Sequence, residues 1–205
     1  PPFLYDSRDR DLIKYHIQQA ESAEIDSLVV SWWGIGSKED KALRVLLDVA
    51  SQMPSRVRMS VQLELAGIEH LDEATVVSQL AYVLEQYGND PAFLRVGGRP
   101  VLFLYNAMPF SSDMQQWQRI VSSPRISRFQ PLLIVDQISE EVLTVFDGYY
   151  LYGHLNVMAV LLGWIPLRQM PGVGTVANTL LLGPFADLNL ALLDAPESLP
   201  IKGAF

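Results

Sequence analysis

The sequence predicts an α/β fold of the (β/α)8 or TIM-type barrel class, whole or truncated. Along residues 1–153, strand-length segments that are apolar or alternate between apolar and polar residues are followed in regular order by amphipathic segments of helical period. Six predicted strands in that length exceed one nucleotide-binding half and suit most of a barrel of parallel strands. A doubly wound open sheet is the alternative, but the Gly-x-Gly-x-x-Gly fingerprint expected after its first strand is missing.

The first half of the chain gives three strands and two helices. Residues 3–5 end a strand, and Asp9 caps a helix that runs to about residue 23. Residues 28–32 form a strand that is apolar on both faces, as in parallel sheets covered by helices. Ser37 or Lys38 opens the next helix, and an alternating strand over 57–63 ends at Glu64.

The alternation continues in the second half. A helix covers about 72–87 and places its apolar residues on one side. Gly97-Gly98-Arg99-Pro100 predicts a turn, and 101–105 follows it as a strand. Ser111 or Ser112 then begins a helix, and the remaining elements are a strand over 132–135, a short helix over 139–145 and a strand over 149–152.

Composition excludes several classes of function. With 205 residues, 49% of them hydrophobic and 19% charged, the chain is expected to fold as one domain of ordinary size. A net charge of -8 argues against a nucleic-acid surface. The absence of cysteine excludes disulfides and thiolate chemistry and leaves the compartment open. No apolar run reaches the roughly 18–20 residues of a membrane span, and the start at Pro1, without a leader, suggests a mature or trimmed product.

Residues 154–205 differ from the barrel portion, 1–153, and form a segment of their own. They are rich in Leu, Val, Ala, Gly and Pro. A solvated segment normally carries more charge, so we expect this one to be packed on the barrel or on another protein. A poorly ordered end with an apolar bias is the alternative. The charged residues of segment 154–205 are Arg168, Asp187, Asp194, Glu197 and Lys202.

The predicted strand ends carry the candidate binding residues, because α/β folds place their sites there. Trp32 and Trp33 offer flat rings to a sugar, although either one can equally pack under the following loop. Tyr150 either reaches the barrel mouth or fills the core. The predicted binding set is Trp32, Trp33, Glu64, Tyr105, Asn106 and Tyr150.

Motifs for other chemistries are missing. His16, His70 and His154 lie far apart and lack the spacing of zinc ligands, so no metal site is expected. The turn at 34–38 lacks the full phosphate-loop pattern, and no Gly-x-Ser-x-Gly elbow is present. We therefore expect no cofactor.

A series of short motifs, in order along residues 3–153, resembles glycoside hydrolase family 99. They are Tyr-Asp-Ser-Arg-Asp at 5–9, Ile-Lys-Tyr-His-Ile at 13–17, Val-Ser-Trp-Trp-Gly at 30–34, Glu-Gln-Tyr-Gly-Asn-Asp-Pro-Ala-Phe-Leu-Arg at 85–95, Gly-Arg-Pro-Val-Leu-Phe-Leu-Tyr at 98–105 and Phe-Asp-Gly-Tyr-Tyr at 146–150. The resemblance implies a (β/α)8 barrel and retaining, endo-acting hydrolysis of an α-mannosidic linkage, with an α-mannoside oligosaccharide as the ligand.

The sequence also departs from this family. Where the family typically has Glu-Pro-Tyr the chain has Glu64-Leu65-Ala66, and Tyr105-Asn106 stands in place of Tyr-Asp. No segment after residue 153 is similar to the family's Asn-Glu-Trp-His-Glu-Gly, which holds its catalytic carboxylates. Glycoside hydrolysis normally needs two positioned carboxyl groups, and Glu64 is the one good strand-end carboxylate, so the catalytic residues stay unassigned.

Two hypotheses of function remain. One is a barrel related to α-mannoside-cleaving enzymes and inactive as this chain. The other is a non-catalytic binding or structural subunit of an assembly, which docks on a protein through residues 154–205.

Overall fold

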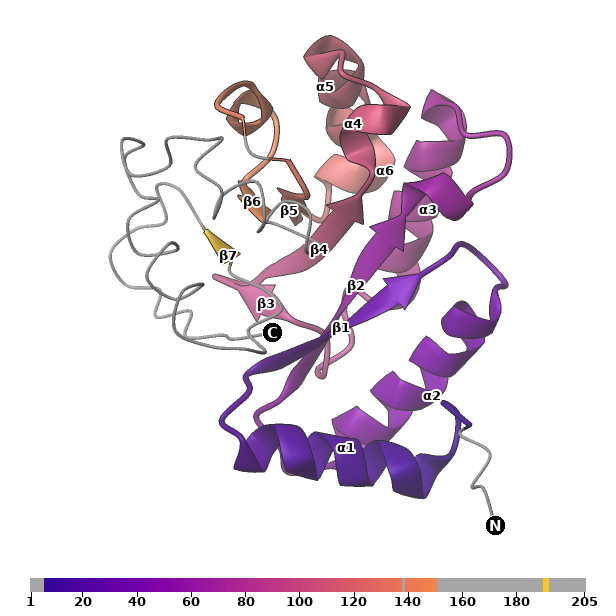
Figure 1. The fold of residues 1–205 in the computed structure, drawn as a ribbon, viewed down its shortest axis with the longest axis vertical. Helices are drawn as coiled ribbons and strands as arrows, with labels where there is room; N and C mark the ends of the chain where they lie inside the picture. Colours follow the sequence, from indigo (N-terminus) through magenta and orange to yellow (C-terminus); the bar gives the residue numbers. More distant parts are fainter. Residues whose placement is uncertain (1–5, 138, 151–189, 192–205) are drawn as a thin grey trace, which may run out of the picture.

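The computed structural model describes residues 6–137, 139–150 and 190–191 of the chain (Figure 1). In these residues one sheet holds parallel strands in the order β1-β2-β4-β5-β6. Because every neighbour in this order is parallel, the carboxyl ends meet at one edge, which we call the rim. The strands are β1 (Ser27–Trp32), β2 (Arg58–Glu64), β4 (Arg99–Tyr105), β5 (Leu132–Val135) and β6 (Gly148–Tyr150).

This topology confirms the predicted fold class. The strand order follows the chain order without the reversal that a doubly wound sheet requires, and helices alternate with strands as in a (β/α)8 barrel. The strands that end at Trp32, Glu64, Tyr105 and Val135 are parallel neighbours, as predicted. The strand predicted at 3–5 and the last two residues of the one predicted at 149–152 lie outside the described residues.

The principal helices follow one another around the same side of the sheet (Figure 1). Asp9, Ser37 and Asp72 cap the first three, as predicted for Asp9 and Ser37. The helix predicted to begin at Ser111 or Ser112 begins at Met114, because the Asp113 carboxylate accepts the N–H of Gln115 (2.9 Å) and so makes the better cap. The helices are α1 (Arg10–Ser22), α2 (Lys38–Gln52), α3 (Glu73–Gln86), α4 (Ala107–Phe110), α5 (Met114–Ser122) and α6 (Pro124–Ser127).

Three short elements complete the described fold. The predicted Gly97-Gly98 turn has positive φ at both glycines (57° and 80°) and joins β3 (Arg95–Val96) to β4 as an antiparallel hairpin. The helix η1 (Leu65–Gly67) follows β2 directly. The helix predicted at 139–145 is a single 3-10 turn, η2 (Glu141–Thr144).

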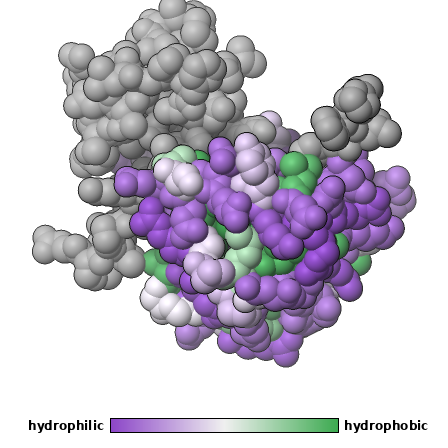
Figure 2. All heavy atoms as spheres, turned by 90° about the horizontal axis from the view of Figure 1, so that it is seen from below, coloured by the Kyte–Doolittle hydropathy of each residue, from purple (hydrophilic) through white to green (hydrophobic). Residues whose placement is uncertain are grey.

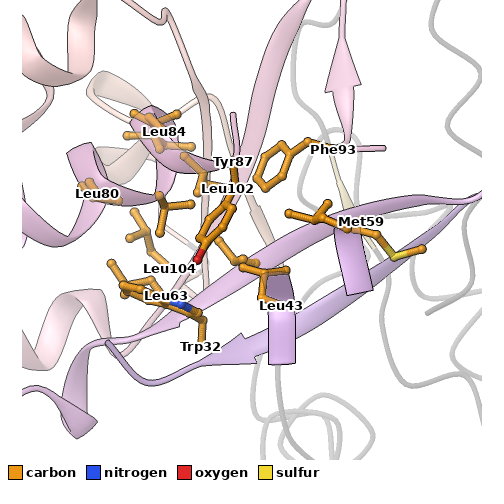
Figure 3. Close-up of a cluster of buried hydrophobic side chains, with 14 of the residues drawn as sticks. Trp32, Leu43, Met59, Leu63, Leu80, Leu84, Tyr87, Phe93, Leu102 and Leu104 are labelled. Atoms are coloured by element: carbon orange, nitrogen blue, oxygen red, sulfur yellow. The ribbon is translucent and has the colours of Figure 1, made fainter. Parts of the chain in front are cut away.

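Alternation along the strands separates two apolar clusters on opposite faces of the sheet. On the helix side, Leu63 and Leu104 belong to a large cluster with Leu43 and Leu80 (Figure 3). The face opposite the helices corresponds to the interior of a closed barrel. Its smaller cluster consists of Val101, Phe103, Ile134 and Tyr150.

Of the apolar segment 154–205, the structure describes only β7 (Leu190–Ala191), which pairs antiparallel with β6. The rest of the prediction for that segment lies outside the described residues. On the face of the molecule seen in Figure 2, hydrophilic residues predominate and hydrophobic ones form small areas among them. Within the described part, every helix is too short or too polar to cross a membrane.

Candidate functional site

A buried carboxylate stands at the rim end of β2. The polar residues Ser60, Gln62 and Glu64 occupy alternate positions of this strand, and the apolar residues between them pack on the helix side. Glu64 is 5% exposed, and its Oε1 accepts hydrogen bonds from Ser31 Oγ (2.6 Å) and Gln62 Nε2 (2.7 Å). Two neutral donors on one oxygen fix the direction of the carboxylate without neutralising its charge.

The same network extends to both sides of Glu64. Ser31 Oγ accepts the indole N–H of Trp33 (3.0 Å), and Gln62 Oε1 accepts the phenolic O–H of Tyr150 (2.9 Å). The carboxylate can only accept, so the amide nitrogen of Gln62 must face Glu64 and its oxygen must face Tyr150. Side chains from β1, β2 and β6 are thereby joined in one hydrogen-bonded chain.

Trp33 is the exposed aromatic side chain of this site. Its side chain is half-exposed, at 49%, while its N–H is held by Ser31. The six-membered ring lies so close to Gly67 that a Cβ there would fall 2.2 Å from Trp33 Cε3. Gly67 therefore allows the indole to rest on η1, and the uncovered part of the ring is available to a ligand.

Trp32, by contrast, is fully buried on the helix side (Figure 3). Its ring stacks on Tyr82, with ring centroids 6.1 Å apart, and its Nε1 donates to the carboxylate of Asp40 (3.3 Å). Successive residues of a strand point to opposite faces, so Trp32 cannot share the face of Ser31. Trp32 therefore packs in the core, which was the alternative to its binding a sugar, and we leave it out of the candidate site.

The Asp40 carboxylate that anchors Trp32 is buried and multiply hydrogen-bonded. It accepts the hydroxyls of Tyr87 (2.6 Å) and Tyr82 (3.0 Å) and the N–H of Gly36 (3.0 Å). Burial by itself would raise the pKa of Asp40, but the hydrogen bonds, that from Tyr87 first, hold this pKa below its ordinary value. Burial and the Asp40 carboxylate in turn raise the pKa of Tyr87. This cluster ties α2, α3 and the loop after β1 together.

The other predicted residues lie at or just below the rim. Tyr105 pairs in register with Glu64, and Asn106 follows it; both are half-buried. Tyr150 is fully buried and packs edge-on against Phe103, with ring centroids 5.6 Å apart. It belongs to the core and supports the site through its hydroxyl. The structure thus brings Trp33, Glu64, Tyr105 and Asn106 to one edge, with Tyr150 beneath them.

Asp136 is a rim residue that the sequence reasoning missed. It directly follows β5, and its Oδ2 accepts the N–H of Asn106 (3.1 Å). Burial raises the pKa of Asp136; the backbone N–H groups of Asn106 and Ala107 oppose this, and the negative charge of Glu64 adds to it. The rule that selected Glu64, an acid at the end of an apolar strand, selects Asp136 as well. Ser31 and Gln62 were also missed, although their alternation with apolar residues marks the inward face.

A hollow of about 460 Å³ lies away from these residues, near the amino ends of β4, β5 and β6. Arg99, on its wall, donates to the carbonyls of Gln130 (2.7 Å) and Pro131 (3.0 Å) and to Asp147 Oδ1 (2.8 Å). The guanidinium of Arg99 therefore holds neighbouring strands together. In barrels of this class the amino-terminal end of the strands normally contributes to stability. Among the described residues, no three His, Cys, Asp or Glu side chains gather as metal ligands would.

Comparisons with known proteins identify a family. The model of glycosyl hydrolase family 99 matches residues 3–159. Glycoprotein endo-alpha-1,2-mannosidase of Mus musculus is 27% identical in an alignment of 169 residues that covers 74% of this chain and 36% of that protein. The human glycoprotein endo-alpha-1,2-mannosidase-like protein is 25% identical, over 72% of this chain and 36% of its own length. The chain thus spans about a third of the length of these relatives.

Solved structures agree with the family model. The GH99 endo-alpha-mannosidase from Bacteroides thetaiotaomicron superposes with a TM-score of 0.60 at 25% identity, over 73% of this chain and 45% of that one. The family model covers most of the chain, and the parallel sheet with its helices is the corresponding part of the barrel. The chain belongs to glycosyl hydrolase family 99 and has a glycosidase fold related to that of the α-mannosidases.

Proposed function

We propose that this chain binds an α-linked mannose oligosaccharide at the rim. The observation that carries the proposal is the pairing of Glu64 with Trp33 through a shared hydroxyl, that of Ser31. A fixed carboxylate accepts hydrogen bonds from sugar hydroxyls, and an exposed ring covers the apolar face of a sugar. Sites for small molecules combine such a surface with a few polar groups that set orientation.

Family membership supports the choice of sugar. The mouse relative is named an endo-alpha-1,2-mannosidase, the human one an endo-alpha-1,2-mannosidase-like protein, and the bacterial structure is of an endo-alpha-mannosidase. An α-1,2-linked mannoside is therefore the first ligand to test. Tyr105 and Asn106 are the further contacts we propose, because they stand beside Glu64 at the end of the neighbouring strand.

We further propose that the chain of 205 residues hydrolyses such sugars slowly or not at all. A retaining or inverting mechanism needs one carboxyl group as proton donor and another as base or nucleophile. The oxygen Oε1 of Glu64 is held by two donors, and the Asp136 carboxylate is engaged with the N–H of Asn106. A longer product of the gene that carried a strand with paired glutamates would favour an active hydrolase instead.

A non-catalytic subunit is the second candidate function. The low charge of residues 154–205 favours it, because an apolar segment of this length is suited to burial against a barrel or another protein. We propose that 1–153 form the barrel portion and that 154–205 pack on it or on a protein partner. Solution mass and hydrogen exchange of the isolated chain test this: a monomer with a strongly protected segment excludes partner docking.

Calorimetric titration with α-1,2-mannotriose tests sugar binding, with maltotriose as the control sugar. Trp33→Ala should weaken binding by about 1–3 kcal/mol, on the scale of aromatic stacking by nucleic-acid bases. Tyr15→Ala is the matched control, because Tyr15 is similarly exposed (55%) but lies on α1. Absence of mannotriose binding by the unmutated chain would reject the proposal, and so would equal losses in the two variants.

A further inference from the structure

Asp136 brings a second carboxyl group to the rim, on a backbone that the sheet holds in place. Its N–H donates to the carbonyl of Leu104 (3.2 Å), which continues the β4–β5 pairing one residue beyond Val135. The side chain of Asp136 thus stands beside the end of β4. There it is hydrogen-bonded to the residue at which β4 leaves the sheet.

That residue is Asn106, and its backbone is left-handed, with φ 59° and ψ 35°. Few residues other than glycine adopt this conformation, and asparagine tolerates it better than most. The N–H of Asn106 donates to Asp136 Oδ2 (3.1 Å), and the next residue, Ala107, is fully buried at the start of α4. The turn is held on one side by the Asp136 carboxylate and on the other by the packing of Ala107.

We propose that Asp136 is a positioning residue of the sugar site: its side-chain oxygen fixes the left-handed turn at Asn106 and thereby the direction from which the Asn106 side chain leaves the backbone. This inference rests on the proposed function, since it concerns how Asn106 meets the same ligand. Asp136 itself acts through Asn106 and need not contact the sugar.

The acceptor oxygen, and not the negative charge, performs this role. Burial raises the pKa of Asp136 and the charge of Glu64 adds to the rise, so the ionised form is held at a cost. An asparagine side chain has nearly the same shape and keeps an oxygen that can accept the same N–H. Asp136→Asn should therefore preserve the turn, whereas Asp136→Ala leaves the N–H of Asn106 without its acceptor.

The chain offers a matched control in Asp147, which directly precedes β6 and lies beside the amino end of β5. Asp147 Oδ2 accepts the N–H of Leu133 (3.0 Å), and Asp147 Oδ1 accepts Arg99 (2.8 Å). Asp147→Ala thus also removes a carboxylate that holds a backbone N–H of a neighbouring strand, but away from the rim. If Asp136→Ala acted only by weakening the fold, its sugar affinity and its Asn106 amide protection should match those of Asp147→Ala.

The experiment measures two quantities on the full chain and on the Asp136→Ala, Asp136→Asn and Asp147→Ala variants. Calorimetry gives the dissociation constant for α-1,2-mannotriose, and NMR-detected hydrogen exchange gives the protection of the Asn106 amide. We expect Asp136→Ala to weaken binding about tenfold and to expose the Asn106 amide to exchange. Asp136→Asn should restore both to near the unmutated values, and Asp147→Ala should leave both unchanged, whatever its thermal stability.

The outcomes separate this inference from the proposed function. If the unmutated chain does not bind mannotriose, the proposed function fails, and the inference about sugar positioning fails with it. If the unmutated chain binds and Asp136→Ala binds equally well, only the inference is overturned. It is also overturned if Asp136→Asn loses binding as Asp136→Ala does, because the charge would then be the required feature.

Discussion

Tyr150 on β6 and Gln62 on β2 are joined by a hydrogen bond of 2.9 Å between two buried side chains. The strands β4 and β5 lie between them in the sheet. In a flat sheet, three strand spacings would separate β2 from β6 by about 14 Å. The bond therefore crosses the interior of a curved sheet, and it supports the Glu64 carboxylate by fixing the amide of Gln62.

Replacing Tyr150 by Phe should destabilise the fold and loosen the site. The amide oxygen of Gln62 would lose its donor in a buried place, which costs about 1–3 kcal/mol of unfolding free energy. Urea denaturation measures this cost. Tyr149→Phe is the control, because the Tyr149 hydroxyl makes no hydrogen bond to another described residue and that change should have a small effect. A loss of similar size in both variants would contradict the assignment.

Gly67→Ala should disturb Trp33 without altering any polar group. The added Cβ would stand 2.2 Å from Trp33 Cε3, so the indole must leave its place on η1. We expect a change in tryptophan fluorescence and a loss of mannotriose affinity comparable to that of Trp33→Ala. The exposed neighbour Ala66, changed to Ser, serves as the control. Unchanged affinity in Gly67→Ala would mean that the ring position is irrelevant to binding.

The strand pattern explains how much of this site could be predicted. The period of two separates Ser31 and Trp33 from Trp32, and it places Gln62 and Glu64 on one face. The apolar residues that alternate with these polar ones, such as Leu63, identify the face that packs against the helices. The acid after β5, Asp136, was equally visible in the sequence, since Val135 ends a clear strand.

Other features depend on three-dimensional closure and leave no local signal. The contact between Gln62 and Tyr150 joins residues 88 positions apart and exists only because the sheet curves. The contact between the Trp33 ring and Gly67 likewise depends on η1, a single turn that no sequence periodicity predicts. The left-handed turn at Asn106 needs an acceptor that arrives 30 residues later, from Asp136.

Asp40→Asn should remove a stabilisation that depends on pH. The pKa of Asp40 is lowered in the folded protein, so its contribution is present above the ordinary aspartate pKa and is lost as pH falls through the folded value. At neutral pH the variant should lose about 2–4 kcal/mol, because donors would face donors in a buried cluster. Thermal melts between pH 3 and 7 should show the gap to the unmutated chain closing toward acid. A gap that is constant with pH would contradict the linkage.

Asp136→Asn should have the opposite pH dependence. The pKa of Asp136 is raised in the folded protein, so the stabilising contribution of protonated Asp136 is present below the ordinary aspartate pKa and disappears as pH rises through the folded value. The neutral amide avoids that loss, and the variant should melt at a higher temperature than the unmutated chain at pH 7. Below the ordinary pKa the difference should vanish. A lower melting temperature at pH 7 would show that the carboxylate stabilises the turn through its charge.

The remaining prediction concerns turnover. Family membership gives the chain a glycosidase fold, while hydrolysis needs a proton donor and a base or nucleophile in position. The absence of one such group typically lowers a rate by about 10²–10⁴-fold, so α-1,2-mannotriose incubated with the chain should remain almost intact by chromatography. Glu64→Gln should weaken binding of the trisaccharide and leave the residual rate at saturating sugar unchanged. Rapid hydrolysis that Glu64→Gln abolishes would establish Glu64 as part of a working catalytic pair, and Asp136 would be the carboxyl group to test next as its complement.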